Sequence, residues 1–245
     1  MRLGRLIPYQ VASGNQQMAL DDWLLKVYCP QSQCPVLRFY GWWPAAISLG
    51  YLQRHYPSHW HNLSWQGRPL EIVRRPSGGR AVLHQGTLTY SLVLPWGGGD
   101  RRQLYNQICQ FLVVGWRQLG ITLCLGEGGR GYIHNASCFN TTTSADLMTP
   151  AGSKVIGSAQ RHRGGAVLQH GAMVLDGDRH LFETVFGQLA PWQQGLNQGA
   201  QRHSLKKIIE TLTWAASQCL NINFQPQPLS SGEYMALATH LLPLV

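Results

Sequence analysis

The sequence is poor in charge, and in acidic residues most of all. Charged residues make up only 13% of the 245 residues, and 11 Asp and Glu stand against 20 Lys and Arg, which leaves a formal net charge of +9. The apolar share of 44% excludes a disordered, highly charged chain and fits a globular protein that can bury a core. Excess positive charge favours acidic partners, which can be a nucleic acid, an anionic membrane or an acidic protein.

The sequence also lacks an apolar run long enough to span a membrane, and it lacks zinc-finger cysteine spacing. Arg5 and Pro8 interrupt the N-terminus before any signal-peptide core, so we expect a cytoplasmic protein with no membrane partner. The six cysteines are expected to be free thiols in that compartment. His55, His59 and His61 have no acidic residue among them, and we therefore expect a surface segment and no metal site.

Periodic apolar residues predict helices early, centrally and late in the chain, with strands between them. The expected helices cover residues 15–29, 101–119, 205–220 and about 231–242. Strands are expected at 36–40, 46–51, 71–73, 87–94, 121–125, 154–160 and 166–176, with a turn at 41–44 and a hairpin turn in RHRGG at 161–165. This order indicates an α+β fold with a mixed, largely antiparallel β-sheet flanked by helices. We expect a single domain over 1–245, with closing helices at about 204–242.

One stretch, Arg74–His84, combines paired glycines with three arginines in the sequence RRPSGGRAVLH. Paired glycines allow positive φ and close approach of the backbone to a ligand, and arginines can face a phosphate or carboxylate. A tight turn with solvated arginines explains the same pattern equally well from the residues alone. A second glycine-rich stretch, GEGGRG at 126–131, lacks the Lys-Ser/Thr ending of a phosphate-binding loop and is interpreted as a mobile loop.

Cys138 and Lys154 are the candidate reactive pair. Cys138 lies in a polar loop, and the thiolate is the reactive form of cysteine. A lysine ammonium folded beneath that loop would favour the thiolate and could bind an acyl carbonyl oxygen. An unreactive loop cysteine and a solvated lysine fit the same residues. His84 and His170 are second candidates for a base or a ligand-orienting group, against a purely structural role.

Four segments together resemble the biotin/lipoate ligase and octanoyltransferase superfamily, and lipoate–protein ligase A-like proteins within it. They are NQQMALDDWLL (15–25), LRFYGWWPAAISLGYLQ (37–53), RRPSGGRAVLHQGTLTYSLV (74–93) and GSKVIGSAQRHRGGAVLQHGAMVLD (152–176). They span most of residues 15–180 in the order found in that family. The resemblance implies a fold like that of class II aminoacyl-tRNA synthetases and biotin ligases, in which a mixed sheet carries a pocket for a lipoyl or octanoyl group.

The resemblance also implies which residues line that pocket. The arginine-glycine stretch contacts the acyl group or its adenylate in this family, and the lysine of the K-x-x-G-S-A-Q strand, here Lys154, contacts the acyl carbonyl. The residues that it implies for substrate binding are Arg74, Ser77, Gly78, Gly79, His84, Gly157, Ser158, Ala159, Gln169, His170 and Gly171. It implies no metal ligand.

Two branches of the family do different chemistry. ATP-dependent lipoate ligases use ATP and Mg²⁺ to activate free lipoate, whereas cysteine-dependent octanoyltransferases move octanoate through an enzyme thioester. Cys138-Phe139 matches the Cys-Phe pair of the transferases, although Asn140–Thr143 stands where that branch has a proline-containing turn. The short segment after Asp176 leaves room for closing helices and not for the accessory domain of a ligase. We therefore expect a transferase that requires no cofactor.

The leading hypothesis is an acyltransferase of protein lipoylation that acts through a Cys138 thioester, with Lys154 orienting the acyl carbonyl. Acyl carrier protein is the expected donor, and a lysine of a lipoyl domain or of glycine-cleavage H protein is the expected acceptor. The alternative is an ATP-dependent lipoate–protein ligase that forms a lipoyl-adenylate. A third interpretation, a non-catalytic acyl-domain or nucleic-acid binder, is suggested by paired arginines. The intact motifs argue against it, so a nucleic-acid partner is not expected.

Overall fold

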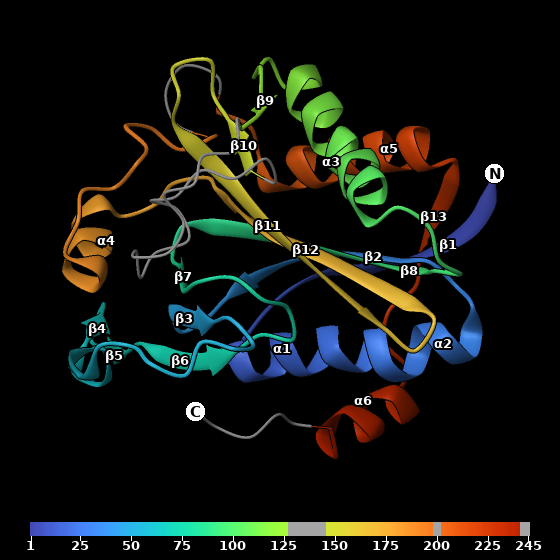
Figure 1. The fold of residues 1–245 in the computed structure, drawn as a ribbon, viewed down its shortest axis with the longest axis horizontal. Coiled ribbons are helices and arrows are strands. Elements are labelled where there is room, and N and C mark those ends of the chain that lie inside the picture. The colour runs from blue at the N-terminus through green and yellow to red at the C-terminus, as the bar shows by residue number, and fades with distance from the viewer. Residues whose placement is uncertain (127–145, 198–201, 241–245) are drawn as a thin grey trace.

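A large mixed β-sheet organises the fold in a computed structural model that describes residues 1–126, 146–197 and 202–240 (Figure 1). The strands follow the order β13-β1-β2-β8-β12-β11-β10-β9 across this sheet. Their bounds are Arg2–Ala12 (β1), Val36–Trp42 (β2), Thr87–Pro95 (β8), Cys124–Leu125 (β9), Asp146–Met148 (β10), Lys154–Arg163 (β11), Ala166–Val174 (β12) and Ile222–Pro226 (β13). β13 and β2 run parallel to β1, and each neighbouring pair from β2 to β9 is antiparallel. The predicted α+β class with a mixed, largely antiparallel sheet is confirmed.

A smaller sheet with the order β6-β3-β7 carries the arginine-glycine loop between two of its strands. Its strands are Ala46–Leu49 (β3), Glu71–Arg74 (β6) and Val82–His84 (β7). Between β3 and β6 lie a 3₁₀ turn at Ser58–Asn62 (η2) and a short ladder of Ser64–Trp65 (β4) with Arg68–Pro69 (β5). Both strands predicted on either side of the 41–44 turn exist, but they lie in different sheets. The reason is that β1 and β8 occupy both edges of β2, while β3 pairs with β6 and β7.

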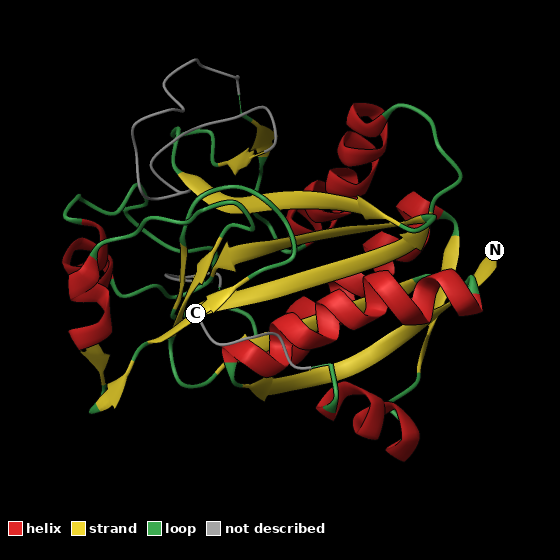
Figure 2. Cartoon of the chain, turned by 60° about the horizontal axis from the view of Figure 1, so that its bottom comes forward, coloured by secondary structure: helices red, strands yellow, loops and turns green. Residues whose placement is uncertain are grey.

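Helices cover both faces of the large sheet. Their bounds are Gly14–Trp23 (α1), Leu24–Tyr28 (η1, a π-helical turn), Cys29–Ser32 (α2), Arg101–Gln118 (α3), Arg179–Phe186 (α4), Leu205–Leu220 (α5) and Ser231–Ala238 (α6). α1, η1 and α2 follow one another as one rod across one face, and α3 lies with α5 on the other (Figures 1 and 2). In the part of the chain that the structure describes, no helix combines the length and the apolar composition required to span a membrane.

The long helices begin at capping residues and bury an apolar face. Asp100 and Ser204 each accept a hydrogen bond from a backbone N–H of the first turn, as predicted for α3 and α5. Trp116 of α3 is completely buried in the core between the helices and the sheet. The last helix ends at Ala238, so its predicted extension to Leu242 is wrong. None of the residues of α6 is fully buried, so packing contributes little that would extend this helix.

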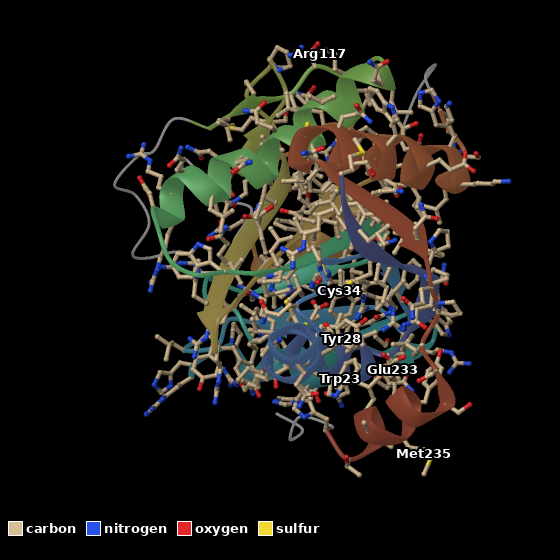
Figure 3. All side chains as sticks on the ribbon, turned by 90° about the vertical axis from the view of Figure 1, so that its right-hand side faces the viewer. Trp23, Tyr28, Cys34, Arg117, Glu233 and Met235 are labelled. Carbon is tan, nitrogen blue, oxygen red and sulfur yellow. The ribbon has the colours of Figure 1, made fainter. Side chains whose placement is uncertain are left out.

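An ion pair ties α6 to the first strand. Arg5 of β1 is only 2% exposed, and its guanidinium donates to both carboxylate oxygens of Glu233, at 2.6 and 2.9 Å. Figure 3 shows Glu233 on the side of α6 that faces the body of the molecule and Met235 on the outer side. The hydrogen bond from Arg5 is the main cause that lowers the pKa of Glu233 to about 2. The first strand and the last described helix are therefore held together.

Candidate active site

A cavity of about 330 Å³ opens where the two sheets meet. Its lining is drawn from α1 (Met18), β2 (Tyr40, Trp42), β3 (Ser48), β7 (Val82, His84), β8 (Thr89), α3 (Tyr105), β10 (Asp146), β11 (Lys154, Gly157, Ser158, Ala159, Gln160), β12 (His170, Gly171, Ala172) and the loop after β6 (Arg75, Gly78, Gly79, Arg80). Aromatic and aliphatic walls with a few charged groups, in a volume of this order, are typical of a site for a small molecule.

The arginine-glycine loop forms one wall of the cavity, and Arg75 holds its shape. The Arg75 guanidinium is 6% exposed and donates to the carbonyl oxygen of Ser48 at 2.8 Å. It also donates to the carbonyl oxygens of Gly78 and Arg80, each at 2.7 Å. Gly79 adopts a φ of 93°, which only glycine tolerates without strain. The loop therefore bends around one buried cation and presents its glycines to the cavity.

Arg74 does not line the cavity, in contrast to the role that the resemblance implied. Its guanidinium donates to the carbonyl oxygens of Gly50 at 3.0 Å and Gln53 at 2.7 Å, which clamps the turn after β3. Successive residues of an extended chain point to opposite sides, so one arginine of the pair faces the cavity while the other faces away. Arg75 takes the place at the cavity that was expected for Arg74.

Lys154 and Asp146 form a buried ion pair on the cavity wall. Lys154 Nζ lies 2.9 Å from Asp146 Oδ2, and the two side chains are only 2% and 3% exposed. Gly157 lies beside them: a Cβ at this position would stand 3.4 Å from Lys154 Cε and 3.8 Å from Nζ. An ammonium held in this way can donate a charge-assisted hydrogen bond to an oxygen bound in the cavity.

A second polar chain runs from α1 to the arginine-glycine loop through His170. Asp21 Oδ2 accepts from Tyr40 Oη and from His170 Nδ1, each at 2.8 Å, and His170 Nε2 lies 2.5 Å from Ser77 Oγ. Burial opposes ionisation of Asp21, but Arg38 and the His170 hydrogen bond outweigh it and lower the pKa of the carboxyl. Asp21 is thus a carboxylate that orients the His170 ring. Ser77 is fully buried behind the cavity wall and does not line it.

His84 stacks on Trp42 at the cavity, with ring centroids 3.8 Å apart. Its Nε2 lies 2.8 Å from Ser48 Oγ, and Arg75 donates to the same oxygen at 3.3 Å. Burial first, and then the charge of Arg75, lowers the pKa of His84 well below its ordinary value, so the ring is neutral.

Hydrogen bonds between β8, β11 and β12 support the wall that carries Ser158. Tyr90 Oη donates to Ser158 Oγ at 2.8 Å, and Gln169 Nε2 donates to Tyr90 Oη at 3.0 Å. A Cβ on Gly171 would stand 2.4 Å from Ser158 Oγ, so this position requires glycine. Gln169 therefore acts behind the wall and is not part of the lining, whereas Gly171 faces the cavity.

The cavity brings together most of the residues implied by the resemblance. Those that line it are Gly78, Gly79, His84, Lys154, Gly157, Ser158, Ala159, His170 and Gly171. Cys138 lies outside the described residues. The five described cysteines are free, none of them lines the cavity, and burial raises the pKa of Cys109 to about 12. Within the described ranges, no three His, Cys, Asp or Glu side chains gather in a way that could hold a metal ion.

Comparison with known proteins agrees with the fold and the motifs. Residues 13–218 match the lipoyl protein ligase A/B catalytic domain family. The chain belongs to this family. The matched region includes every residue that lines the cavity.

Relatives within the lipoyl protein ligase A/B family include octanoyltransferases. The octanoyltransferase LipM of Carboxydothermus hydrogenoformans is 40% identical over 186 residues, which cover 73% of this chain and 67% of that protein. LipM of Moorella thermoacetica is 32% identical over 252 residues, which cover 94% and 90%. A crystal structure of lipoate-protein ligase A bound with ATP matches with a TM-score of 0.78 at 22% identity, covering 97% of this chain and 93% of that one, and demonstrates a shared fold.

Several residues that line the cavity were not predicted from the sequence of this member of the lipoyl protein ligase A/B family. The missed residues include Met18, Tyr40, Trp42, Ser48, Tyr105 and Asp146. Asp146 could have been predicted from the sequence, because it is the only acidic residue between Glu127 and Asp176 and lies eight positions before Lys154. The aromatic residues carried no such signal, since apolar residues of a strand belong to the core more often than to a site.

Proposed function

We propose that this chain is an octanoyltransferase of protein lipoylation, in which the cavity holds an octanoyl or lipoyl group and Lys154 binds its carbonyl oxygen. The observation that carries the proposal is the buried Lys154–Asp146 pair on the wall of an apolar cavity, 2.9 Å apart. The LipM relatives, at 32–40% identity, support the choice of transferase. The catalytic unit proposed is one domain over residues 1–245, closed by the helices at about 204–242.

Cys138 is the proposed nucleophile of two successive acyl transfers. In the first, the Cys138 thiolate attacks the acyl carbon of octanoyl-acyl carrier protein: the new Sγ–C bond replaces the donor's S–C bond, and the donor thiol takes up the proton. In the second, a lysine amine of a lipoyl domain or glycine-cleavage H protein attacks. A C–N bond forms, the Sγ–C bond breaks, and the amine proton returns to Cys138.

The described residues have distinct parts in this proposal. Lys154 donates to the carbonyl oxygen as negative charge develops on it, and Asp146 holds the ammonium in place. Arg75 shapes the glycine loop against the acyl chain, while the Asp21–His170–Ser77 chain holds that loop to the sheet. Neutral His84 packs its ring against Trp42 in the wall.

The thioester donor supplies the driving force, so the transferase requires no cofactor and no metal. ATP and Mg²⁺ would be required only by the alternative, an ATP-dependent lipoate–protein ligase. This alternative is considered because the chain shares its fold with the ATP-bound ligase. A cytoplasmic location follows from the proposed carrier-protein donor. Neither a membrane nor a nucleic acid takes part in the proposed reaction.

Intact-protein mass spectrometry separates the two activities. The protein is mixed with octanoyl-acyl carrier protein without ATP, and we expect an octanoyl adduct that hydroxylamine removes and that Cys138→Ser abolishes. Absence of an adduct, together with AMP release from ATP and lipoate by both the wild type and Cys138→Ser, would establish the ligase and refute the thioester mechanism.

A further inference from the structure

The mouth of the cavity is bordered by a surface that the proposed chemistry leaves unused. The turn after β3 lies on the arginine-glycine loop: the Tyr51 N–H donates to Ser77 O at 2.8 Å, and a Cβ on Gly50 would stand 1.8 Å from Gly79 O. From the other side, the Arg161 guanidinium of β11 covers the Tyr51 ring, 4.6 Å from its centroid. We call this surface the rim, and define it as residues 50–53, 79–80 and 159–161.

The rim combines exposed apolar side chains with positive charge. Leu52 is 79% exposed and Tyr51 is 45% exposed, and the backbone N–H of Tyr51 joins this turn to the arginine-glycine loop that lines the cavity. Arg80 and Arg161 are both partly exposed. The segments that supply the rim, residues 42–70, 72–99 and 147–175, contain no Asp or Glu. Part of the net charge of +9 is therefore concentrated where a substrate must enter.

We propose that the rim is the docking surface for the acidic carrier protein that delivers the acyl group. This inference rests on the proposed octanoyltransferase function. A carrier protein presents its acyl chain on a phosphopantetheine arm, and the phosphodiester of that arm is an anion that remains at the mouth when the thioester reaches the cavity. Arg80 and Arg161 meet this anion and the acidic surface of the carrier, and Leu52 with Tyr51 supplies the apolar contact.

The charge of the rim favours the donor over the acceptor as its occupant. The acceptor presents a lysine, which is a cation in water, and two arginines at the mouth repel a cation on its approach. The donor presents an anionic arm, which the same arginines attract. Arg74 also supports this surface, because its guanidinium donates to the carbonyl oxygens of Gly50 and Gln53.

The experiment compares two octanoyl donors that share the reacting thioester. Octanoyl-acyl carrier protein requires docking, and octanoyl-N-acetylcysteamine is small and neutral. The rim variants are Arg161→Glu and Leu52→Asp, with Arg161→Gln as a milder change. Lys206→Glu is the matched control, because it changes the net charge by the same amount at a side chain that is 85% exposed. Lys206 belongs to α5, which lies with α3 on the face of the large sheet opposite α1 (Figure 1).

With the carrier donor, we expect the second-order rate of adduct formation to fall about tenfold in Arg161→Glu and about fivefold in Leu52→Asp. Both variants should react with the neutral donor at the wild-type rate, and Lys206→Glu should match the wild type with either donor. The wild-type rate with the carrier should also fall as salt rises, and this dependence should be weaker in Arg161→Glu.

Three results would overturn the proposal. If Arg161→Glu lowered the rate of adduct formation equally with both donors, Arg161 would act in the acyl-transfer step and not in docking. If the rim variants lowered the rate with neither donor, the rim would not be the docking surface. Slower transfer from a preformed adduct to a lipoyl domain, with normal adduct formation, would assign the rim to the acceptor. If the wild type forms no adduct from either donor, the proposed function fails. Direct binding of the carrier protein, measured by calorimetry for wild type and Arg161→Glu, then still decides the docking question.

Discussion

Replacement of Asp146 by Asn should destabilise the protein by about 3 kcal/mol and slow acyl transfer. The carboxylate lies 2.9 Å from Lys154 Nζ, and the two side chains are only 3% and 2% exposed, so the pair is largely shielded from bulk water. Removal of one partner of a buried ion pair costs about 3–5 kcal/mol, because the remaining charge loses its compensation. The adjacent cavity can admit water, which favours the lower value. A loss of about 3 kcal/mol lowers the Tm by roughly 6–12 °C for a chain of this size.

The assay is a double-mutant cycle on Asp146→Asn, Lys154→Met and the double variant, with unfolding followed in urea and by calorimetry. The double variant removes both charges and should be more stable than Asp146→Asn alone, with a coupling energy above about 1 kcal/mol. Of these three variants only Asp146→Asn retains Lys154, and only this variant should form the octanoyl adduct, more slowly than the wild type. Unfolding of Asp146→Asn at the wild-type urea concentration, or additive effects of the two changes, would refute the energetic role of the pair.

Three further predictions concern the scaffold. Arg5 lowers the pKa of Glu233 to about 2, so the ion pair between them contributes its full stability above pH 4.5 and loses it as the pH falls toward 2. Glu233→Gln should therefore make the urea midpoint of unfolding decline less steeply between pH 4.5 and 2 than in the wild type. Gly171→Ala places a Cβ 2.4 Å from Ser158 Oγ and should cost about 1–3 kcal/mol and most of the transfer rate; an unchanged Tm contradicts the close approach. Asp100→Ala removes the cap of α3 and should cost about 1 kcal/mol in calorimetry, with adduct formation unchanged.

Elements whose signals are local were predictable from the sequence. α5 has the predicted bounds because Ser204 caps it and its apolar residues repeat at helical spacing. β1 was missed because Arg5 and Pro8 interrupt its apolar pattern. Arg5 is buried among partners distant in sequence, above all Glu233, a residue 228 positions later, and no local pattern indicates such a partner.

The site residues were predictable from the sequence where a motif fixes the backbone conformation. They were much less predictable where the direction of a side chain decides whether the residue lines the cavity. The glycines of the loop and the lysine of β11 were recognisable, since their roles depend on the main chain and on a fixed spacing. The choice between Arg74 and Arg75 depends on which side of the strand end each faces, and adjacent identical residues carry no signal for that. Met18 and Tyr40 reach the cavity only because α1 packs on β2 and β8 joins β2 to β12 in the sheet, which is a property of the tertiary fold.

The hydrogen-bond chain through His170 also constrains the order in which the site can assemble. His170 lies 149 positions after Asp21 and 93 positions after Ser77, so both contacts have high sequence separation. Contacts of this kind form late, because the entropy of closing a long loop must be overcome first. During synthesis the first helix and the arginine-glycine loop emerge well before β12, and their partner is missing until β12 has left the ribosome. The loop therefore acquires its final shape only after β12 has joined the sheet, and chains truncated before β12 lack an ordered acyl cavity.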